Sequence, residues 1–218
     1  MQAVGSIPAI ICNHTGRYEG DLKYYFKVVF NHAKNLANPY HNFRHLFHVL
    51  YLCSEACGYY HTFAISKRDA RDLLIAAIFH DFDHPGRTGN DDLNIEISLR
   101  ALRKHILPED KPFLGDIEYL IKCTEFPYRV PSIEISFLAC VLRDADMAQV
   151  FSIAWIQQII FGLANEMNMT PRKVLEMQES FLSAMSFNTK WATETFNNGG
   201  IQSKVEEARA LLSILDND

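Results

Sequence analysis

The sequence contains little that would build β-structure. Alternating runs of β-branched residues are lacking, and there are 10 glycines in 218 residues, sparse outside a few turns. Apolar residues recur mostly at spacings of three and four, which is typical of amphipathic helices. A chain of this length fits one domain with a sizeable core. We therefore expect an all-α protein with a single compact multi-helix domain at 20–218, preceded by an irregular segment at 1–19.

Signals for membranes, secretion and nucleic acids are also lacking. There is no run of 18 apolar residues, and Met1–Ala9 has neither the basic nor the apolar region of a signal peptide. The formal net charge of -5 provides no general basic surface of the kind that nucleic-acid-binding proteins use. The five cysteines are odd in number and scattered, which indicates free thiols in a reducing compartment. These features favour a cytoplasmic protein with neither a membrane nor a nucleic acid as partner.

Local signals divide the chain into helices. Asn38-Pro39 should end the first helix, Ser66 and Ser132 are suitable N-caps, and Thr170-Pro171 combines a cap with a first-turn proline. A loop is expected at 84–90 and a turn at 126–131. The expected helices cover residues 20–36, 41–60, 67–79, 92–105, 113–123, 132–151, 154–166, a stretch that begins at 171, 187–196 and 201–215.

The stretch His80–Gly86 places two imidazoles and two carboxylates within five positions. It directly follows Leu73–Phe79, the most apolar run of the chain. Buried charge is costly unless it is paired or bound to a metal. The pattern therefore predicts a metal site at the end of a buried helix.

Two other segments could complete such a site. His41 and His45 are four apart at the start of an expected helix and should share a face. Asp144 and Asp146 follow another apolar run, and their spacing places them on different faces, so one of them should face the metal. His45, His80, Asp81 and one of these aspartates would offer two nitrogens and two oxygens, a set that suits zinc, manganese or iron. Asp81 could also bridge to a second ion completed by water, as magnesium or manganese tolerates.

At these residues the chain resembles the HD-domain metal-dependent phosphohydrolases, and within them the catalytic domain of class I cyclic-nucleotide phosphodiesterases. Tyr40–His45 is similar to the family motif Y-H-N-x-x-H, and His80–Gly86 matches H-D-x-D-H-P-G. Ala145-Asp146 resembles the Ala-Asp pair that supplies the last metal ligand of that family. Gln178–Phe181 resembles its Q-x-x-F, in which the glutamine bonds the nucleobase and the aromatic ring stacks on it. Trp191 is loosely consistent with a family tryptophan in the same region.

The resemblance implies a specific set of roles. Two divalent ions would be held by His45, His80, Asp81 and Asp146, which the resemblance favours over Asp144. A metal-bound hydroxide would open a 3′,5′-cyclic nucleotide to its 5′-monophosphate, with His41 as the general acid for the leaving 3′ oxygen.

Other residues would act around the ions or on the substrate. His84 would lie near the hydroxide and orient it or relay its proton, and Glu96 could hold its ring. Asp83 would bond loop amides. The expected substrate-binding residues are Tyr40, Gln178, Phe181 and Gln149, the last standing where the family usually has an asparagine.

The chain is shorter than the usual eukaryotic catalytic domain, and it lacks the Ser-Asn-Pro that commonly follows the last ligand. Three alternatives therefore stay open. A nucleotidase or nucleoside triphosphohydrolase would need cations for the phosphates, and Arg44, Arg87 and Arg103 are available. A di-iron oxygenase would need further histidines, and the presence of His84 and His105 alone in the relevant stretch argues against it. The third alternative is a nucleotide sensor without catalysis. The pattern indicates neither the base nor the oligomeric state.

Overall fold

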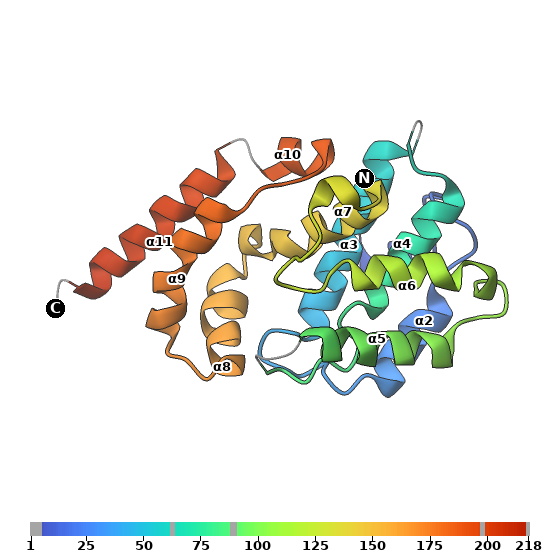
Figure 1. Cartoon of the computed structure of the whole chain (residues 1–218), viewed down its shortest axis with the longest axis horizontal. Helices are drawn as coiled ribbons and strands as arrows, with labels where there is room; N and C mark the ends of the chain where they lie inside the picture. The colour runs from blue at the N-terminus through green and yellow to red at the C-terminus, as the bar shows by residue number, and fades with distance from the viewer. Residues whose placement is uncertain (1–5, 62–63, 88–90, 197–198, 217–218) are drawn as a thin grey trace.

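The computed structural model of the chain describes residues 6–61, 64–87, 91–196 and 199–216. Every regular element in this part is helical, which confirms the predicted all-α class (Figure 1). Three of the elements are single 3₁₀ turns and one is a π-helix. The elements are α1 Ile7–Ile11, α2 Lys23–His32, α3 Phe43–Tyr60, α4 Lys67–Phe79, α5 Asp91–His105, η1 Lys111–Phe113, α6 Leu114–Lys122, η2 Ser132–Glu134, α7 Phe137–Met147, η3 Ala148–Phe151, the π-helix η4 Ile156–Leu163, α8 Ala164–Glu166, α9 Pro171–Ala184, α10 Lys190–Phe196 and α11 Gly200–Asp216.

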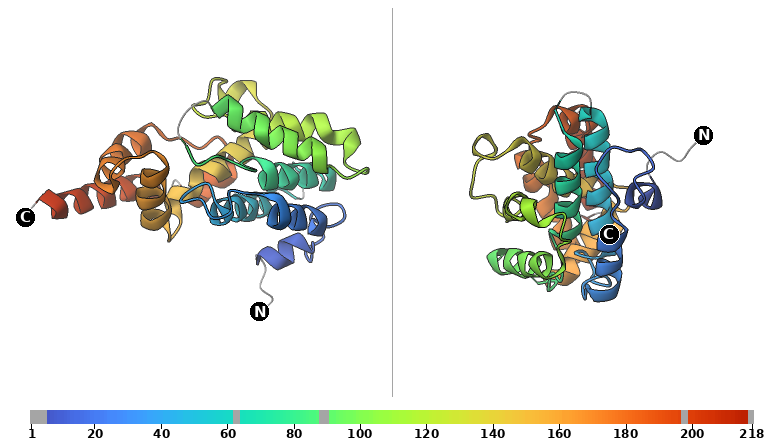
Figure 2. Two further views of the ribbon diagram at one scale, coloured as in Figure 1. Left: turned by 90° about the horizontal axis from the view of Figure 1, so that it is seen from below. Right: turned by 90° about the vertical axis from the view of Figure 1, so that its right-hand side faces the viewer.

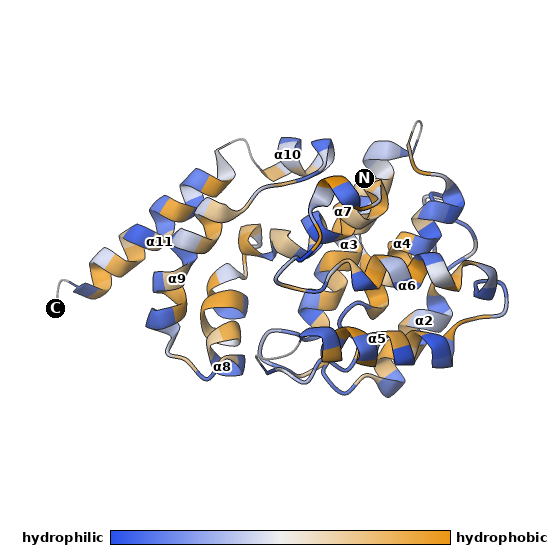
Figure 3. Ribbon diagram, viewed as in Figure 1, coloured by the Kyte–Doolittle hydropathy of each residue, from blue (hydrophilic) through white to orange (hydrophobic). Residues whose placement is uncertain are grey.

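Helix α4 is the centre of the larger part of the core. It packs against α2, α3, α5, α6 and α7, and its residues from Ala70 to Phe79 are all buried. Its start is fixed by a capping box in which Ser66 and Asp69 bond each other's backbone amides. In Figure 3, α4 is blue over its first turns and orange over its remaining turns, and α5 at the surface carries many hydrophilic positions. The most apolar run of the sequence has therefore become the innermost helix.

A second, smaller core joins η3, the π-helix, α8, α9 and α11. Trp155 and Leu182 are almost fully buried in it, and α9 and α11 form its longest contact. These helices lie together on the left of Figure 1, and Figure 2 shows α11 running away from the rest of the molecule to the C-terminus. Helices from both groups contribute side chains to the site described below.

Several predicted helix boundaries are confirmed. The helix at 67–79 begins and ends as expected, and Thr170 caps α9 through the amide of Lys173, with Pro171 in the first turn. The expected N-cap Ser132 is wrong, because a 3₁₀ turn intervenes and α7 begins at Phe137 behind its own cap, Ser136. The sequence signal of a serine before an apolar run occurs twice there, and local pattern alone does not distinguish the two.

Two further expectations need correction. The segment 1–19 is not wholly irregular, because Ser6 caps the short helix α1, and Ile10, Ile11 and Tyr18 are buried in the larger core. The stretch 154–166 was expected to be one ordinary helix, but most of it is π-helical. Residues 88–90 of the expected loop lie outside the described residues.

Among the described helices, none is by itself long and apolar enough to cross a membrane. The pair Phe137–Phe151 and Ile156–Glu166 passes the same length and composition criteria together, with a bend of 96° between its halves.

A buried ion network ties α2 and α4 to the segment before α6. The Asp110 carboxylate is fully buried and accepts bonds of 2.7 Å from both Nε and Nη2 of Arg71. It also accepts a bond of 2.6 Å from the Tyr25 hydroxyl and lies 2.9 Å from a guanidinium nitrogen of Arg68. Burial alone would raise the pKa of Asp110, but the hydrogen bonds from Arg71 and Tyr25 outweigh it and hold that pKa below its ordinary value.

Asp110→Asn should lower the free energy of unfolding at pH 7 by about 3–5 kcal/mol, because it leaves buried guanidinium groups without their counter-charge. Asp110 has a lowered pKa in the folded state, so its contribution is present above the ordinary aspartate pKa of 3.8 and is lost as the pH falls through the lowered value. Urea unfolding of both proteins between pH 7 and pH 2 measures this, and the difference should shrink toward the acid end. The adjacent exposed residue provides a control, since Glu109→Gln should change stability little.

Candidate metal centre and acid pair

The buried helix α4 ends directly at the first histidine of the motif. His80 is its C-cap, and its Nδ1 lies 2.9 Å from the carbonyl oxygen of Ala77, so Nδ1 carries the proton and Nε2 points away from the helix. Ser98 on α5 donates a hydrogen bond of 2.8 Å to the carbonyl oxygen of His80. The imidazole is 1% exposed. Local backbone bonds therefore fix both the position and the tautomer of this ring.

Four side chains from three helices converge on one point. Nε2 of His45 lies 3.1 Å from Oδ2 of Asp81 and 3.1 Å from Oδ1 of Asp146. Nε2 of His80 lies 3.3 Å from Nε2 of His45, 3.2 Å from Oδ2 of Asp81 and 3.8 Å from Oδ1 of Asp146. The structure thus brings together the four residues that the sequence analysis named as ligands.

Spacing and charge at this point suit a divalent cation. Ligand atoms about 2.0–2.1 Å from one ion would lie roughly 3.0–3.4 Å from each other, as most of these atoms do. Burial alone would lower the pKa of His45, but hydrogen bonds to Asp146 and Asp81 raise it to about 10. Burial would raise the pKa of Asp81, but the charge of His80 and the bond to His45 hold it well below its ordinary value. A cation would replace the shared protons, so the residues present fit the metal site.

Asp144 and Asp146 lie in the last turn of α7 and point in different directions. The Asp144 carboxylate is 1% exposed and accepts hydrogen bonds of 2.8–3.1 Å from the backbone amides of Asn188 and Thr189 and from the side chain of Asn188. It therefore holds the segment that leads into α10, and Asp146 alone of the two lies in the His45 and His80 cluster.

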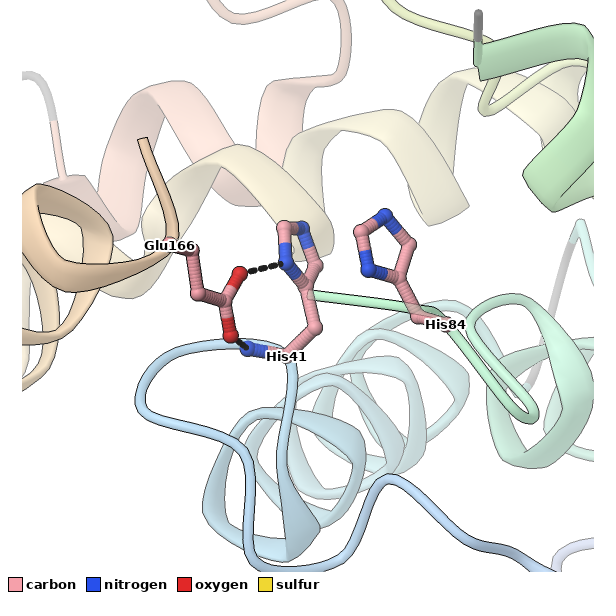
Figure 4. Close-up of side chains that lie close together, drawn as sticks. All are labelled: His41, His84 and Glu166. Carbon is pink, nitrogen blue, oxygen red and sulfur yellow. Dashed lines mark hydrogen bonds and ion pairs between the residues drawn. The ribbon is translucent and has the colours of Figure 1, made fainter. Parts of the chain in front are cut away.

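His41 lies just before α3 rather than on it, since Asn42 is the N-cap and its side chain accepts the amides of Arg44 and His45. A carboxylate from the distant helix α8 holds His41 instead. Oε2 of Glu166 lies 2.5 Å from Nδ1 of His41, and Oε1 accepts the backbone amides of Tyr40 and His41 at 2.8 and 2.9 Å (Figure 4). Burial would raise the pKa of Glu166, but the bonds from His41 lower it below its ordinary value.

Glu166 is the functional residue that sequence reasoning missed. It ends an apolar stretch and belongs to no motif, and its burial arises from folding over a separation of 125 residues. No local pattern would have connected it with His41. Its carboxylate keeps Nδ1 of His41 protonated and leaves Nε2 to face the cavity that these residues line.

His84 stacks on His41 with ring centroids 3.6 Å apart and planes at 21°, an arrangement visible in Figure 4. The backbone amide of Gly86 donates to its Nδ1 at 3.1 Å, and its Nε2 lies 2.9 Å from the side-chain amide of Asn94. Glu96, the expected partner, instead pairs with Arg103 at the surface. Burial, followed by the charge of His41, lowers the pKa of His84 to about 4, so this imidazole is neutral at pH 7.

A buried amide links the His41 and Asp81 segments. Nδ2 of Asn35, which is 2% exposed, donates to the carbonyl oxygens of His41 and Asp81, both at 2.9 Å. Its Oδ1 accepts the amide of Asp83 at 3.1 Å, and the Asp83 carboxylate accepts the amide of Lys34 at 2.7 Å. Asp83 therefore bonds loop amides, as expected.

A cavity of about 640 Å³ opens beside the candidate metal ligands and beside the group formed by His41, His84 and Glu166. Tyr40, Gln178 and Phe181 line it, along with apolar side chains of the second core. The Gln178 amide is already held, because its oxygen accepts Nε1 of Trp155 at 3.3 Å and its nitrogen donates to the carbonyl oxygen of Val174 at 3.2 Å. One lone pair and one N–H of Gln178 remain for a ligand.

Gln149, which was predicted to bind the substrate, and Trp191, which was matched to a family tryptophan, both lie away from the cavity. Gln149 is 3% exposed, is not among the residues that line the cavity, and donates to Ser152 at 3.0 Å, so the geometry does not support a substrate-binding role for it. Trp191 is buried in the larger core. Both positions had been placed by sequence spacing, which does not fix where the short segments between motifs turn.

Of the candidate phosphate-binding arginines, Arg87 lines the cavity. Arg44 donates to Gln157 in a separate depression, and Arg103 is paired with Glu118 at the surface. His105 stacks with His32, with ring centroids 5.0 Å apart, and belongs to neither cluster of possible metal-binding residues found in the described part of the chain.

Comparison with known proteins now adds to this geometry. The family described as 3'5'-cyclic nucleotide phosphodiesterase matches residues 40–104. The high affinity cGMP-specific 3',5'-cyclic phosphodiesterase 9A of Mus musculus is 39% identical over 74 residues, which make up 33% of this chain and 14% of that relative. The protein of the same name from Homo sapiens is 38% identical over 74 residues, 33% of this chain and 12% of that relative. The aligned part thus spans about a seventh or less of these curated relatives.

The family match contains His41, His45, His80, Asp81 and His84, and it ends before Asp146, Glu166 and Gln178. The comparisons support a class I cyclic-nucleotide phosphodiesterase-like domain, and that family is dependent on divalent metals. For these later residues, the support comes from their position around the cavity and in the His45 and His80 cluster.

Asp146→Asn should abolish the stabilisation by Mn²⁺, which for the unsubstituted protein is about 2.7 kcal/mol at a hundredfold excess over the Kd. Asp144→Asn should instead lower stability without metal by about 1–3 kcal/mol, because it weakens the bonds to Asn188 and Thr189, and it should keep the gain from Mn²⁺. Thermal unfolding with and without Mn²⁺ measures both effects. A Mn²⁺ response that survives Asp146→Asn would remove Asp146 from the ligand set.

Proposed function

We propose that this phosphodiesterase-like domain is a metal-dependent phosphoric diester hydrolase that opens a 3′,5′-cyclic nucleotide to its 5′-monophosphate. The observation that carries the proposal is the placement of the His41 and Glu166 pair beside the cluster of His45, His80, Asp81 and Asp146, at the wall of one cavity. Hydrolysis of an alkyl phosphodiester needs an activated water and a proton for the leaving oxygen. The cluster of four ligands suits the first task, and the His41 and Glu166 pair suits the second.

His45, His80, Asp81 and Asp146 would hold the tighter ion, for which zinc, manganese or iron suits the mixed nitrogen and oxygen donors. Asp81 has a second carboxylate oxygen that would reach another ion, magnesium or manganese, completed by water. Bound there, the ions would polarise the phosphoryl oxygens and lower the pKa of water.

The protein's own groups would handle the proton. His41, held through Nδ1 by Glu166, presents Nε2 to the cavity and would protonate the departing 3′ oxygen. The Glu166 carboxylate bonds Nδ1 and aligns the ring toward the cavity. Both ring nitrogens of His84 are engaged by Gly86 and Asn94, so His84 would support His41 by stacking on its ring rather than orient water.

Tyr40, Gln178 and Phe181 would bind the nucleotide, with the base against Phe181 and the remaining N–H and lone pair of Gln178. The relatives are named as cGMP-specific, so cGMP is the first substrate to test. The five cysteines are all free thiols, which supports a cytoplasmic location as part of the proposal.

A nucleoside triphosphohydrolase is the second candidate on the sequence, but Arg87 alone of the three candidate arginines lines the cavity. A screen of cGMP, cAMP, cyclic dinucleotides and nucleoside triphosphates with Mn²⁺, Mg²⁺ or Zn²⁺ tests the function. We expect 5′-monophosphate from a cyclic mononucleotide. Release of tripolyphosphate or orthophosphate without ring opening would overturn the proposal.

His41→Ala should lower kcat on the cyclic nucleotide by about 10²–10⁴-fold, because the leaving oxygen loses its proton donor. Glu166→Gln should lower it by roughly 10–100-fold, since the ring stays in place with a weaker partner. Both variants should bind metal as the unsubstituted protein does, by elemental analysis. Loss of metal together with activity would contradict the assignment of His41 as the acid.

A further inference from the structure

The π-helix η4 passes unusually close to the chain segment that carries His41. A Cβ built on Gly162 would lie 2.4 Å from the carbonyl oxygen of Pro39 and 3.0 Å from its carbonyl carbon. Both neighbours are backbone atoms, so neither can move away by a side-chain rotation. Gly162 is buried, and the contact exists because this residue has no side chain.

Two further contacts from the same helical segment reach the same loop. Four residues before Gly162, Oε1 of Gln158 accepts Nδ2 of Asn42 at 3.3 Å. Four residues after it, Glu166 accepts the amides of Tyr40 and His41 and bonds the His41 ring. Gln158, Gly162 and Glu166 all contact this loop, so they lie on the side of the helical segment that is turned toward it. The loop 39–42 rests on this face at three successive points.

We propose that Gly162 is a positioning residue for the His41 and Glu166 pair. Because Gly162 has no side chain, the backbone of Pro39 packs directly against the helix. In this position the following residues, Tyr40 and His41, are close enough for Glu166 to bond their backbone amides and the His41 ring. A methyl group at 162 would push Pro39 outward and separate Nδ1 of His41 from Glu166. The role of the pair as proton donor rests on the proposed function, whereas the contact itself does not.

If Gly162 had no role beyond its place in a helix, replacing it by alanine would have the opposite effect on the protein. Alanine is the better helix former, so Gly→Ala at an open helical position should stabilise the protein. Gly115 in α6 provides that control, because a Cβ there would meet nothing within 4 Å. Gly115→Ala should raise the unfolding temperature and leave activity unchanged. Gly162→Ala should not raise it.

The experiment compares the unsubstituted protein, Gly162→Ala, Gly115→Ala and His41→Ala, each loaded with Mn²⁺. Activity is measured on the cyclic nucleotide and on bis(p-nitrophenyl) phosphate, whose p-nitrophenolate leaves without a proton. The hydrogen bond is measured on separate samples loaded with diamagnetic Zn²⁺, because paramagnetic Mn²⁺ would broaden nearby proton resonances. It is observed as the downfield proton resonance on Nδ1 of His41, identified by its loss in His41→Ala. Metal content is measured for every variant.

Gly162→Ala should lower kcat on the cyclic nucleotide by about 10²-fold or more, keep the p-nitrophenyl diester within about threefold, and lose the downfield resonance. Its Mn²⁺ content should stay normal. Retention of the resonance and of the cyclic-nucleotide activity would overturn the proposal. So would an equal loss on both substrates, which would indicate general damage to the site.

If the unsubstituted protein cleaves no cyclic nucleotide, the proposed function fails, and the resonance alone decides the role of Gly162: loss in Gly162→Ala with retention in Gly115→Ala supports it. If Gly162→Ala does not fold, Gln158→Ala loosens the same face without a clash. A weakened resonance in that variant supports the proposal, and an unchanged one overturns it.

Discussion

The structure depends on the charge carried at the end of its most buried helix. Leu73–Phe79 has no polar side chain to bond, and it delivers His80 and Asp81 into an interior where unpaired charge is unfavourable. His45 from α3 and Asp146 from α7 provide the partners for these charged groups. Both α3 and α7 pack against α4. The packing of the core therefore also determines the geometry of the candidate metal site, because the helices that bury α4 supply the side chains around its end.

Much of this could be predicted because the signals were local or contained in short motifs. The period of the apolar residues identified the helices, and the boundaries of α4 and the start of α9 followed from Ser66 and Thr170. The set of His45, His80, Asp81 and Asp146 was predicted from the chemistry of metal ligands and from the family resemblance. In the structure, these four side chains lie together. A costly cluster of charge after an apolar run is a strong signal because few arrangements can accommodate it.

The rest depended on contacts that no local pattern encodes. Glu166 reaches His41 across 125 residues, and the π-helix that delivers it looks like an ordinary amphipathic stretch. Asn94 rather than Glu96 meets His84, because a difference of two positions turns a helical side chain from the interior to the surface. Gln149 was placed by counting from Asp146, but the 3₁₀ turn after α7 directs its side chain to Ser152.

The amide of Asn35 has a mechanical consequence. It joins the carbonyl oxygens of His41 and Asp81 through one buried side chain, which ties those two segments to each other. Glu166 belongs to the other group of helices, together with Gln178 and Phe181. One wall of the cavity therefore carries His41 and the candidate metal ligands, and the other carries Glu166, Gln178 and Phe181. Under the proposed function, a shift of α8 and α9 would change proton donation and base binding together and would leave the candidate metal ligands in place.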